Sequence, residues 1–227
     1  MKVLNTIKNK SLKTHIMKNK AIIICTMMMI CCLSAMAQKP FKNLTKTEPV
    51  VAVKSPTIVD FVSSYLSETD DELRGNIANE WRKFLRNEPL SQGVSFQVDM
   101  KNGYLRYDMD DDLAYPDEKT GVKTCVEFCY WNCDDNAHKL FAENVSITQN
   151  EKPLFTEFSG MYIYAYDNAT QNLYMIDQDL LGIDEELHGE VVFTLPRKGK
   201  DIEVNILNSK KGQKKLVWNG KGFKLSK

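Results

Sequence analysis

The sequence has few of the residues on which catalytic motifs depend. Its 227 residues include only three histidines, of which His138 and His188 lie beyond position 37. It contains no Gly-x-Ser-x-Gly elbow, no His-Glu-x-x-His zinc helix and no glycine-rich phosphate loop. These absences argue against the hydrolase, metalloprotease and nucleotide-binding classes that depend on such motifs. Carboxylate chemistry is left as the catalytic alternative.

The sequence also lacks an apolar run of the roughly 20 residues that a membrane-spanning helix needs. Its longest apolar run, Ala21–Leu33, has 13 residues; it follows six lysines and no acidic residue, and it precedes Ser34-Ala-Met-Ala37. A basic segment, a short apolar core and a small-x-small site predict a secretory signal peptide over residues 1–37, with Met17 as an alternative start to Met1. Cleavage after Ala37 implies export to the periplasm or cell surface of a bacterium.

Cysteine is scarce beyond the leader, where only Cys125, Cys129 and Cys133 remain. An odd number of cysteines does not make a disulfide framework. The remaining 190 residues are enough for one domain with a hydrophobic core. They carry 24 basic and 30 acidic residues, and this mildly acidic balance excludes a nucleic-acid partner.

Helical periodicity is confined to one part of the chain. Residues 38–56 contain Lys-Pro, Glu-Pro and Ser-Pro pairs and are predicted to form a flexible linker. Apolar residues in 58–66 recur at helical spacing, which predicts a short amphipathic helix. The segment Thr69-Asp-Asp-Glu72 matches a capping box, so a second helix is expected from there to about Asn87.

Beyond Gly93 the apolar pattern alternates, as it does in β-strands. Asn102-Gly103 between two alternating runs predicts a hairpin, and the later runs are also joined by short, turn-rich segments. For residues 57–227 we therefore expect a single α+β domain, in which two N-terminal helices pack on a curved, mostly antiparallel sheet of about seven to nine strands. A sheet of that size can fold over into a sandwich or half-barrel.

The most aromatic run, 124–133, is expected to be a central strand. Its three cysteines then share one face with Glu127 and Trp131, because strand side chains alternate. Cysteines four residues apart lie about 13 Å apart at about 3.3 Å per residue, whereas a disulfide needs Cα atoms within about 7 Å. Buried free thiols are therefore expected, with a metal or redox site and pairing between chains as alternatives. Glu127 is the one charge on this face, so its burial would demand a partner or a raised pKa.

The acidic run Asp108-Met-Asp-Asp-Asp112 resembles the start of a calcium loop. Leu113 and Lys119 replace the glycine and the glutamate that such a loop needs. A solvated loop is expected, and a looser calcium site that shares Asp117 or Glu118 is the alternative. We predict no metal site and no cofactor.

Tyr162, Tyr164 and Tyr166 fall on one face of a predicted strand. Such a ladder either stacks a sugar or fills cross-strand packing. Together with Glu127 and Trp131, these tyrosines are the candidate ligand-binding residues.

Charge is distributed unevenly along the chain. Residues 99–190 hold 20 acidic and six basic residues, whereas residues 197–227 hold two acidic and ten basic residues. Either the two parts solvate different faces, or they form a surface dipole that orients a charged partner.

Both ends of the chain resemble those of a group of bacterial proteins. The lysine- and asparagine-rich leader ending Ala-Met-Ala-Gln and the closing hairpin Leu216–Phe223 resemble secreted proteins of gut Bacteroidetes with no assigned activity. The resemblance implies secretion and no particular activity.

The observations favour an exported binding module over an enzyme. Its partner would be a small ligand, a glycan or a protein bound through the sheet, with no nucleic acid and no stable membrane span in the mature chain. The alternative is a hydrolase of glycans or peptidoglycan that uses a pair of carboxylates about 5 to 9.5 Å apart.

Overall fold

A computed structural model describes residues 45–47, 51–67, 69, 71–114, 120–176, 190–209 and 212–226. The helices in these ranges are α2 (Ile58–Tyr65), α3 (Glu72–Leu85) and α4 (Asp111–Ala114). The strands are β1 (Thr45–Thr47), β2 (Val94–Asp99), β3 (Tyr104–Asp110), β4 (Val122–Asn132), β5 (His138–Gln149), β6 (Lys152–Leu154), β7 (Gly160–Asp167), β8 (Asn172–Ile176), β9 (Val191–Thr194), β10 (Ile202–Ile206), β11 (Gln213–Trp218) and β12 (Phe223–Leu225). The predicted leader over 1–37 and His188 lie outside the described residues.

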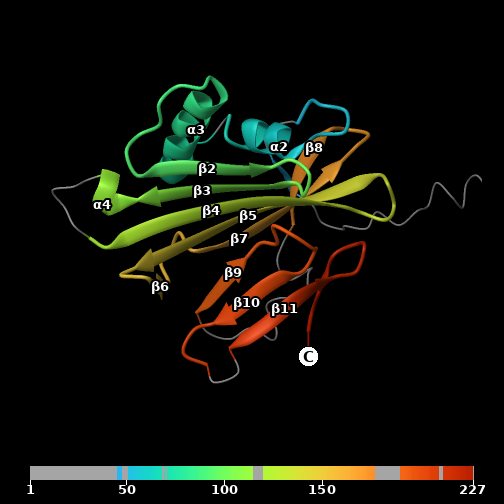
Figure 1. Cartoon of the computed structure of the whole chain (residues 1–227). Coiled ribbons are helices and arrows are strands. Elements are labelled where there is room, and N and C mark those ends of the chain that lie inside the picture. Colours follow the sequence, from blue (N-terminus) through green and yellow to red (C-terminus); the bar gives the residue numbers. More distant parts are fainter. Residues whose placement is uncertain are drawn as a thin grey trace, which may run out of the picture. The chain divides into compact units, whose positions relative to one another are not determined.

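The strands form two separate antiparallel sheets (Figure 1). The larger sheet has eight strands in the order β1-β8-β7-β5-β4-β3-β2, with β6 paired to β5. The smaller has four strands in the order β12-β11-β10-β9. Helices α2 and α3 cover one face of the larger sheet, and the smaller sheet lies against the other face (Figure 1). Strand β4 is therefore covered on both sides.

The prediction of two N-terminal helices on a single curved sheet is wrong. The chain is mostly β, its strands divide between two sheets, and α2 follows a strand, β1, that already belongs to the larger sheet. Strands β9 to β12 have one apolar face, with buried Phe193, Ile202 and Leu216. That face covers the second face of the larger sheet. Alternation in the sequence indicates which side chains point inward, but it does not say which strands share hydrogen bonds.

Individual elements follow from the local sequence. The hairpin of β2 and β3 forms as predicted, with Asp99 opposite Tyr104. Gly103 has φ +64°, and a Cβ there would lie 2.6 Å from the Tyr130 ring, so both the backbone and the packing require glycine. The expected strand at 124–133 is confirmed as β4, which lies between β3 and β5.

Both predicted helices exist, but their caps differ from the prediction. The capping box belongs to α2, where Thr57 N donates to Asp60 Oδ2 at 2.8 Å and Asp60 N donates to Thr57 Oγ1. Helix α3 begins after Asp71, whose Oδ1 accepts from Arg74 N at 2.9 Å. Thr69 stands outside α3 and accepts from the Asp71 backbone N–H. Asp71 is the better cap because its carboxylate also favours the positive end of the helix dipole.

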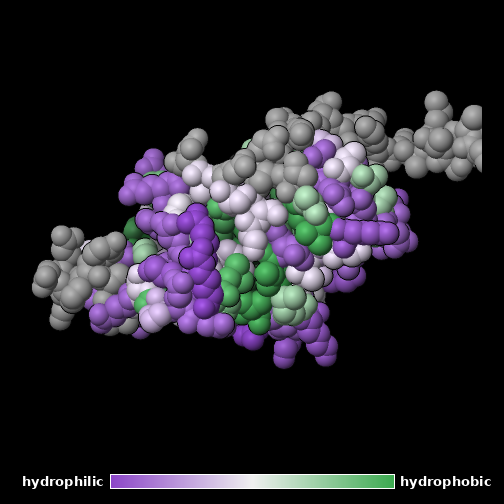
Figure 2. Space-filling model, turned by 90° about the horizontal axis from the view of Figure 1, so that it is seen from above, coloured by the Kyte–Doolittle hydropathy of each residue, from purple (hydrophilic) through white to green (hydrophobic). Residues whose placement is uncertain are grey.

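The main core lies between the helices and the larger sheet. Phe61 of α2 stacks on Phe141 of β5 at 5.1 Å and meets the edge of Tyr166 at 5.2 Å. Trp81 of α3 packs against Phe96 of β2 at 5.3 Å. From the side of the helices, Figure 2 shows hydrophobic surface between otherwise hydrophilic side chains.

Part of the range assigned to a linker is structured. Thr45–Thr47 pairs with β8, and Val51 is fully buried and donates its backbone N–H to Gln171 O at 3.1 Å. Among the residues that the structure describes, no helix combines the length and apolarity that crossing a bilayer requires.

Candidate functional site

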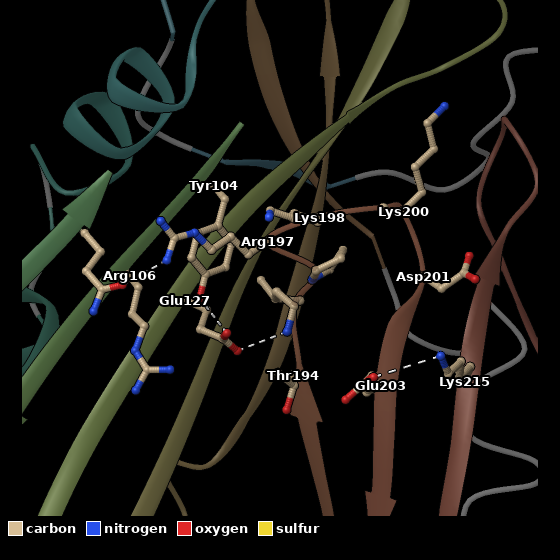
Figure 3. A pocket seen from close by; sticks show the side chains of 14 residues that line it. Tyr104, Arg106, Glu127, Thr194, Arg197, Lys198, Lys200, Asp201, Glu203 and Lys215 are labelled. Atoms are coloured by element: carbon tan, nitrogen blue, oxygen red, sulfur yellow. Dashed lines mark hydrogen bonds and ion pairs between the residues drawn. The ribbon is translucent and has the colours of Figure 1, made fainter. Parts of the chain in front are cut away.

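A cleft of about 460 Å³ opens where β3 and β4 face the turn between β9 and β10. Figure 3 shows the side chains around it. Its basic lining residues are Arg106, Arg197, Lys198, Lys200 and Lys215. Its acidic lining residues are Glu127, Asp201 and Glu203. The lining is therefore rich in charge and has more cations than anions.

Glu127 lines this cleft from β4 and is only 3 % exposed. Its Oε1 accepts from Tyr104 Oη at 2.7 Å, and its Oε2 accepts from Asn144 Nδ2 and from Leu195 N, each at 3.0 Å. Burial and the adjacent Glu127 carboxylate raise the pKa of Tyr104, so the phenol stays protonated and donates. Strands β3 and β5 and the residue after β9 thus supply one donor each. Figure 3 shows the bond between Tyr104 and Glu127. Glu127, the one charged residue on the cysteine face, therefore links the two sheets through its hydrogen bonds.

Trp131 supports the turn that carries the basic side chains. It is 3 % exposed, and its Nε1 donates to Lys200 O at 2.9 Å. The other end of the turn is held by Arg197, which donates to Gln97 Oε1 at 3.3 Å and lies 3.5 Å from Asp99 Oδ2. The turn is therefore fixed to the larger sheet at two points. Trp131 itself is not available to a ligand.

The cations of the cleft differ in how far they are neutralised. Arg106 forms a fork with Asp108, with nitrogen–oxygen distances of 2.6 to 2.9 Å. Lys198 and Lys200 are exposed and form no ion pair among the described residues. Figure 3 shows Lys200 extending away from Glu127. The uncompensated positive charge of the cleft therefore lies on the turn.

Cys125 and Cys129 of β4 and Cys133, which directly follows it, are free thiols, as the strand spacing predicts. Cys129 and Cys133 are buried, with Cys129 Sγ 3.7 Å from Pro196 O beside the smaller sheet, and Cys125 is half-buried. Burial raises the pKa of each of these thiols to about 12. No group of side chains in the described ranges could hold a metal ion. The thiols act as apolar packing residues.

The three tyrosines of β7 differ in exposure, because α2 covers two of them. Tyr164 is 6 % exposed and lies 2.9 Å from the Tyr65 hydroxyl, and Tyr166 is fully buried and donates to Val53 O at 2.9 Å. Tyr162 is 36 % exposed. Of the three predicted binding tyrosines, Tyr162 is the one with substantial exposed surface.

A second buried carboxylate, Glu143, was not predicted from the sequence. It projects from β5 toward the helices, is fully buried, and accepts from Tyr65 Oη at 2.8 Å and from two nitrogens of Arg74. Burial alone would disfavour the charge of Arg74, but the hydrogen bonds and the charge of Glu143 outweigh it and raise the pKa of Arg74. The sequence offers one signal, since Glu143 directly follows the apolar residues Leu140-Phe-Ala142.

Two carboxylates of the acidic run bind other groups of the protein itself. Asp110 lies 3.0 Å from Lys123 Nζ, and Asp112 Oδ1 accepts from the backbone N–H groups of residues 120 and 121. Asp117 and Glu118, the further ligands of the alternative calcium site, lie outside the described residues.

Comparison with family models, with curated proteins and with solved structures finds no match to this chain.

Replacing Glu127 tests its structural role. Glu127→Ala leaves three donors without their acceptor, and each buried unpaired donor costs about 1–3 kcal/mol, so the free energy of unfolding should fall by at least about 3 kcal/mol. Glu127→Gln keeps one oxygen for the two N–H donors and offers its amide to Tyr104 Oη, so the loss should be about 1 kcal/mol. Urea denaturation measures both values. Glu203→Gln, at an exposed cleft carboxylate, is the control and should change stability by less than about 0.5 kcal/mol. Equal losses in the two Glu127 variants would contradict this role.

Alkylation tests the burial of the thiols. A pKa of about 12 leaves about one thiol in 10,000 ionised at pH 8, and the thiolate is the reactive form. We expect iodoacetamide to leave Cys129 and Cys133 unmodified in the folded protein and to label all three cysteines in urea, as measured by mass spectrometry. Glutathione under the same conditions gives the rate of an exposed thiol. Labelling of folded Cys129 at that rate would contradict the assignment.

Proposed function

We propose that the protein is an exported binding module without catalytic activity, in the periplasm or at the cell surface of a bacterium, whose cleft takes a small anionic ligand. Export is supported by the basic and apolar composition of residues 1–37 and by the resemblance of both chain ends to secreted Bacteroidetes proteins. The cleft volume of about 460 Å³ suits a small molecule.

The basic turn between β9 and β10 is the main reason to expect an anionic ligand. Lys198 and Lys200 stand on a turn that is anchored through Arg197 at one end and through Trp131 at the other. Because the turn is already ordered, a ligand would not have to pay the entropy of ordering it. An anion would supply a partner for these two lysines, neither of which forms an ion pair with a described residue.

The state of the acidic residues supports binding over hydrolysis. Both oxygens of Glu127, the buried carboxylate of the cleft, already accept hydrogen bonds. Glu143, the other deeply buried carboxylate described, lies on the opposite face of the larger sheet. A glycosidase needs two carboxylates facing one substrate, and Glu127 and Glu143 face different layers. The other two carboxylates of the cleft are partnered as well: Asp201 Oδ1 accepts from Trp218 N at 3.0 Å, and Glu203 Oε1 lies 3.9 Å from Lys215 Nζ.

Thermal unfolding with three sugars tests the cleft. Glucuronate and glucose 6-phosphate at saturation should raise the melting temperature of residues 38–227 by at least about 2 °C, whereas glucose should not, because ligands that bind the native state stabilise it. Lys198→Ala/Lys200→Ala should abolish the rise. The matched control, Lys221→Ala/Lys224→Ala, removes the same charge from exposed positions outside the cleft and should keep it. Equal loss in the two double variants, or no rise with either anion, would overturn the proposal.

Processing of the leader tests export. Expressed at full length in a bacterium of the Bacteroidetes, the protein should be recovered outside the cytoplasm with Gln38 as its first residue, as measured by mass spectrometry of the intact chain. Ala37→Tyr should block cleavage, because the processing site requires a small residue there. Recovery of the uncleaved wild-type chain in the cytoplasm would contradict export.

A further inference from the structure

A second pocket lies on the helix-bearing face of the larger sheet, away from the cleft. It has a volume of about 270 Å³, and the start of α3, strand β5 and the segment from Glu157 to Tyr162 line it. This volume is slightly below the usual range for ligand pockets, about 300–1,000 Å³, so it suits a single ring more than an extended molecule.

Arg74 is held rigidly at this pocket. Its Nε lies 3.1 and 3.2 Å from the two Glu143 oxygens, and its Nη2 lies 2.6 Å from Oε2. The guanidinium also lies against two aromatic rings, 5.4 Å from the Tyr65 centroid and 5.1 Å from the Tyr162 centroid. Its remaining nitrogen, Nη1, makes no hydrogen bond to the described residues, so Arg74 presents a fixed and unused donor.

Exposed aromatic surface borders this donor. Phe158 is 52 % exposed and Tyr162 is 36 % exposed, and both line the pocket. Phe158 stands on a tight turn in which Ser159 N donates to Thr156 O at 3.0 Å and Phe158 N donates to Thr156 Oγ1 at 3.2 Å. Phe158 and Tyr162 thus offer two partly exposed rings at one pocket, on which an apolar face of a ligand can stack.

The charge of this pocket differs from that of the cleft. The positive charge of Arg74 is offset by Glu143, and the carboxylates of Asp71 and Glu157 also line the pocket. An anionic ligand would be repelled. A neutral ligand with hydroxyl groups could accept from Arg74 and donate to Asp71 and Glu157 while its apolar face covers Phe158.

We propose that this pocket binds a neutral sugar ring of a glycan. A pyranose combines the two required surfaces, since its hydroxyl groups lie around the edge and its C–H groups form an apolar face. Arg74 and the two carboxylates would bind the edge, and Phe158 would stack on the face. Binding here is independent of the anionic ligand proposed for the cleft.

Isothermal titration of residues 38–227 tests the site with four neutral probes: cellohexaose, xylohexaose, mannohexaose and chitopentaose. At least one of them should bind, and Phe158→Ala should weaken that binding at least tenfold, because it removes the stacking surface. Phe155→Ala is the matched control: it removes an equally large ring, 44 % exposed, from the same connection but outside the pocket lining. It should change the affinity by less than twofold.

Two results would overturn this site. One is that none of the four neutral oligosaccharides binds, whether or not polygalacturonate does. The other is that Phe155→Ala weakens binding as much as Phe158→Ala. Lys198→Ala/Lys200→Ala should leave oligosaccharide affinity unchanged, so failure of the cleft and failure of this pocket are separately measurable.

Discussion

The fold depends on how one buried carboxylate is satisfied. Strand β4 is covered by helices on one face and by the smaller sheet on the other, so Glu127 cannot reach bulk water. A charge in that position is tolerated only when hydrogen bonds replace its hydration. The three donors come from β3, from β5 and from the residue after β9, so satisfying the carboxylate also sets the position of the smaller sheet. The cleft lies where this junction opens.

The same reasoning explains why the two buried carboxylates do different things. Phe128, the residue after Glu127, stands opposite Glu143 in the β4–β5 register, so the two glutamates lie on neighbouring strands and point to opposite faces. Glu127 receives neutral donors and joins two sheets, whereas Glu143 receives a guanidinium and a phenol and fixes Arg74 at a surface pocket. The sheet that separates them also keeps them from acting on one substrate.

The sequence predicts the local structure well and the assembly of the sheets poorly. Hydrophobic periodicity is a local property, so the strand at 124–133, the hairpin at Asn102-Gly103 and the helix at 58–66 could be recognised. Whether β9 pairs with β8 or begins a new sheet depends on hydrogen bonds between distant segments, which periodicity does not encode. For the site, the sequence isolates Glu127 as a lone charge on an apolar face. It gives Arg74 no such distinction, because Arg74 is one of several charges on a helix and only the fold brings it to Glu143.

The proposed export would leave three thiols in the mature chain, Cys125, Cys129 and Cys133, all in or next to β4. In an oxidising compartment an accessible third cysteine would form disulfides between chains. Burial raises the thiol pKa values of Cys129 and Cys133 to about 12 and hides both from partners, and Cys129 lies against the end of β9. The contact that Glu127 maintains between the sheets is therefore also what keeps Cys129 inert. A variant that loosens this contact should lose stability and chemical protection together, because one interface provides both.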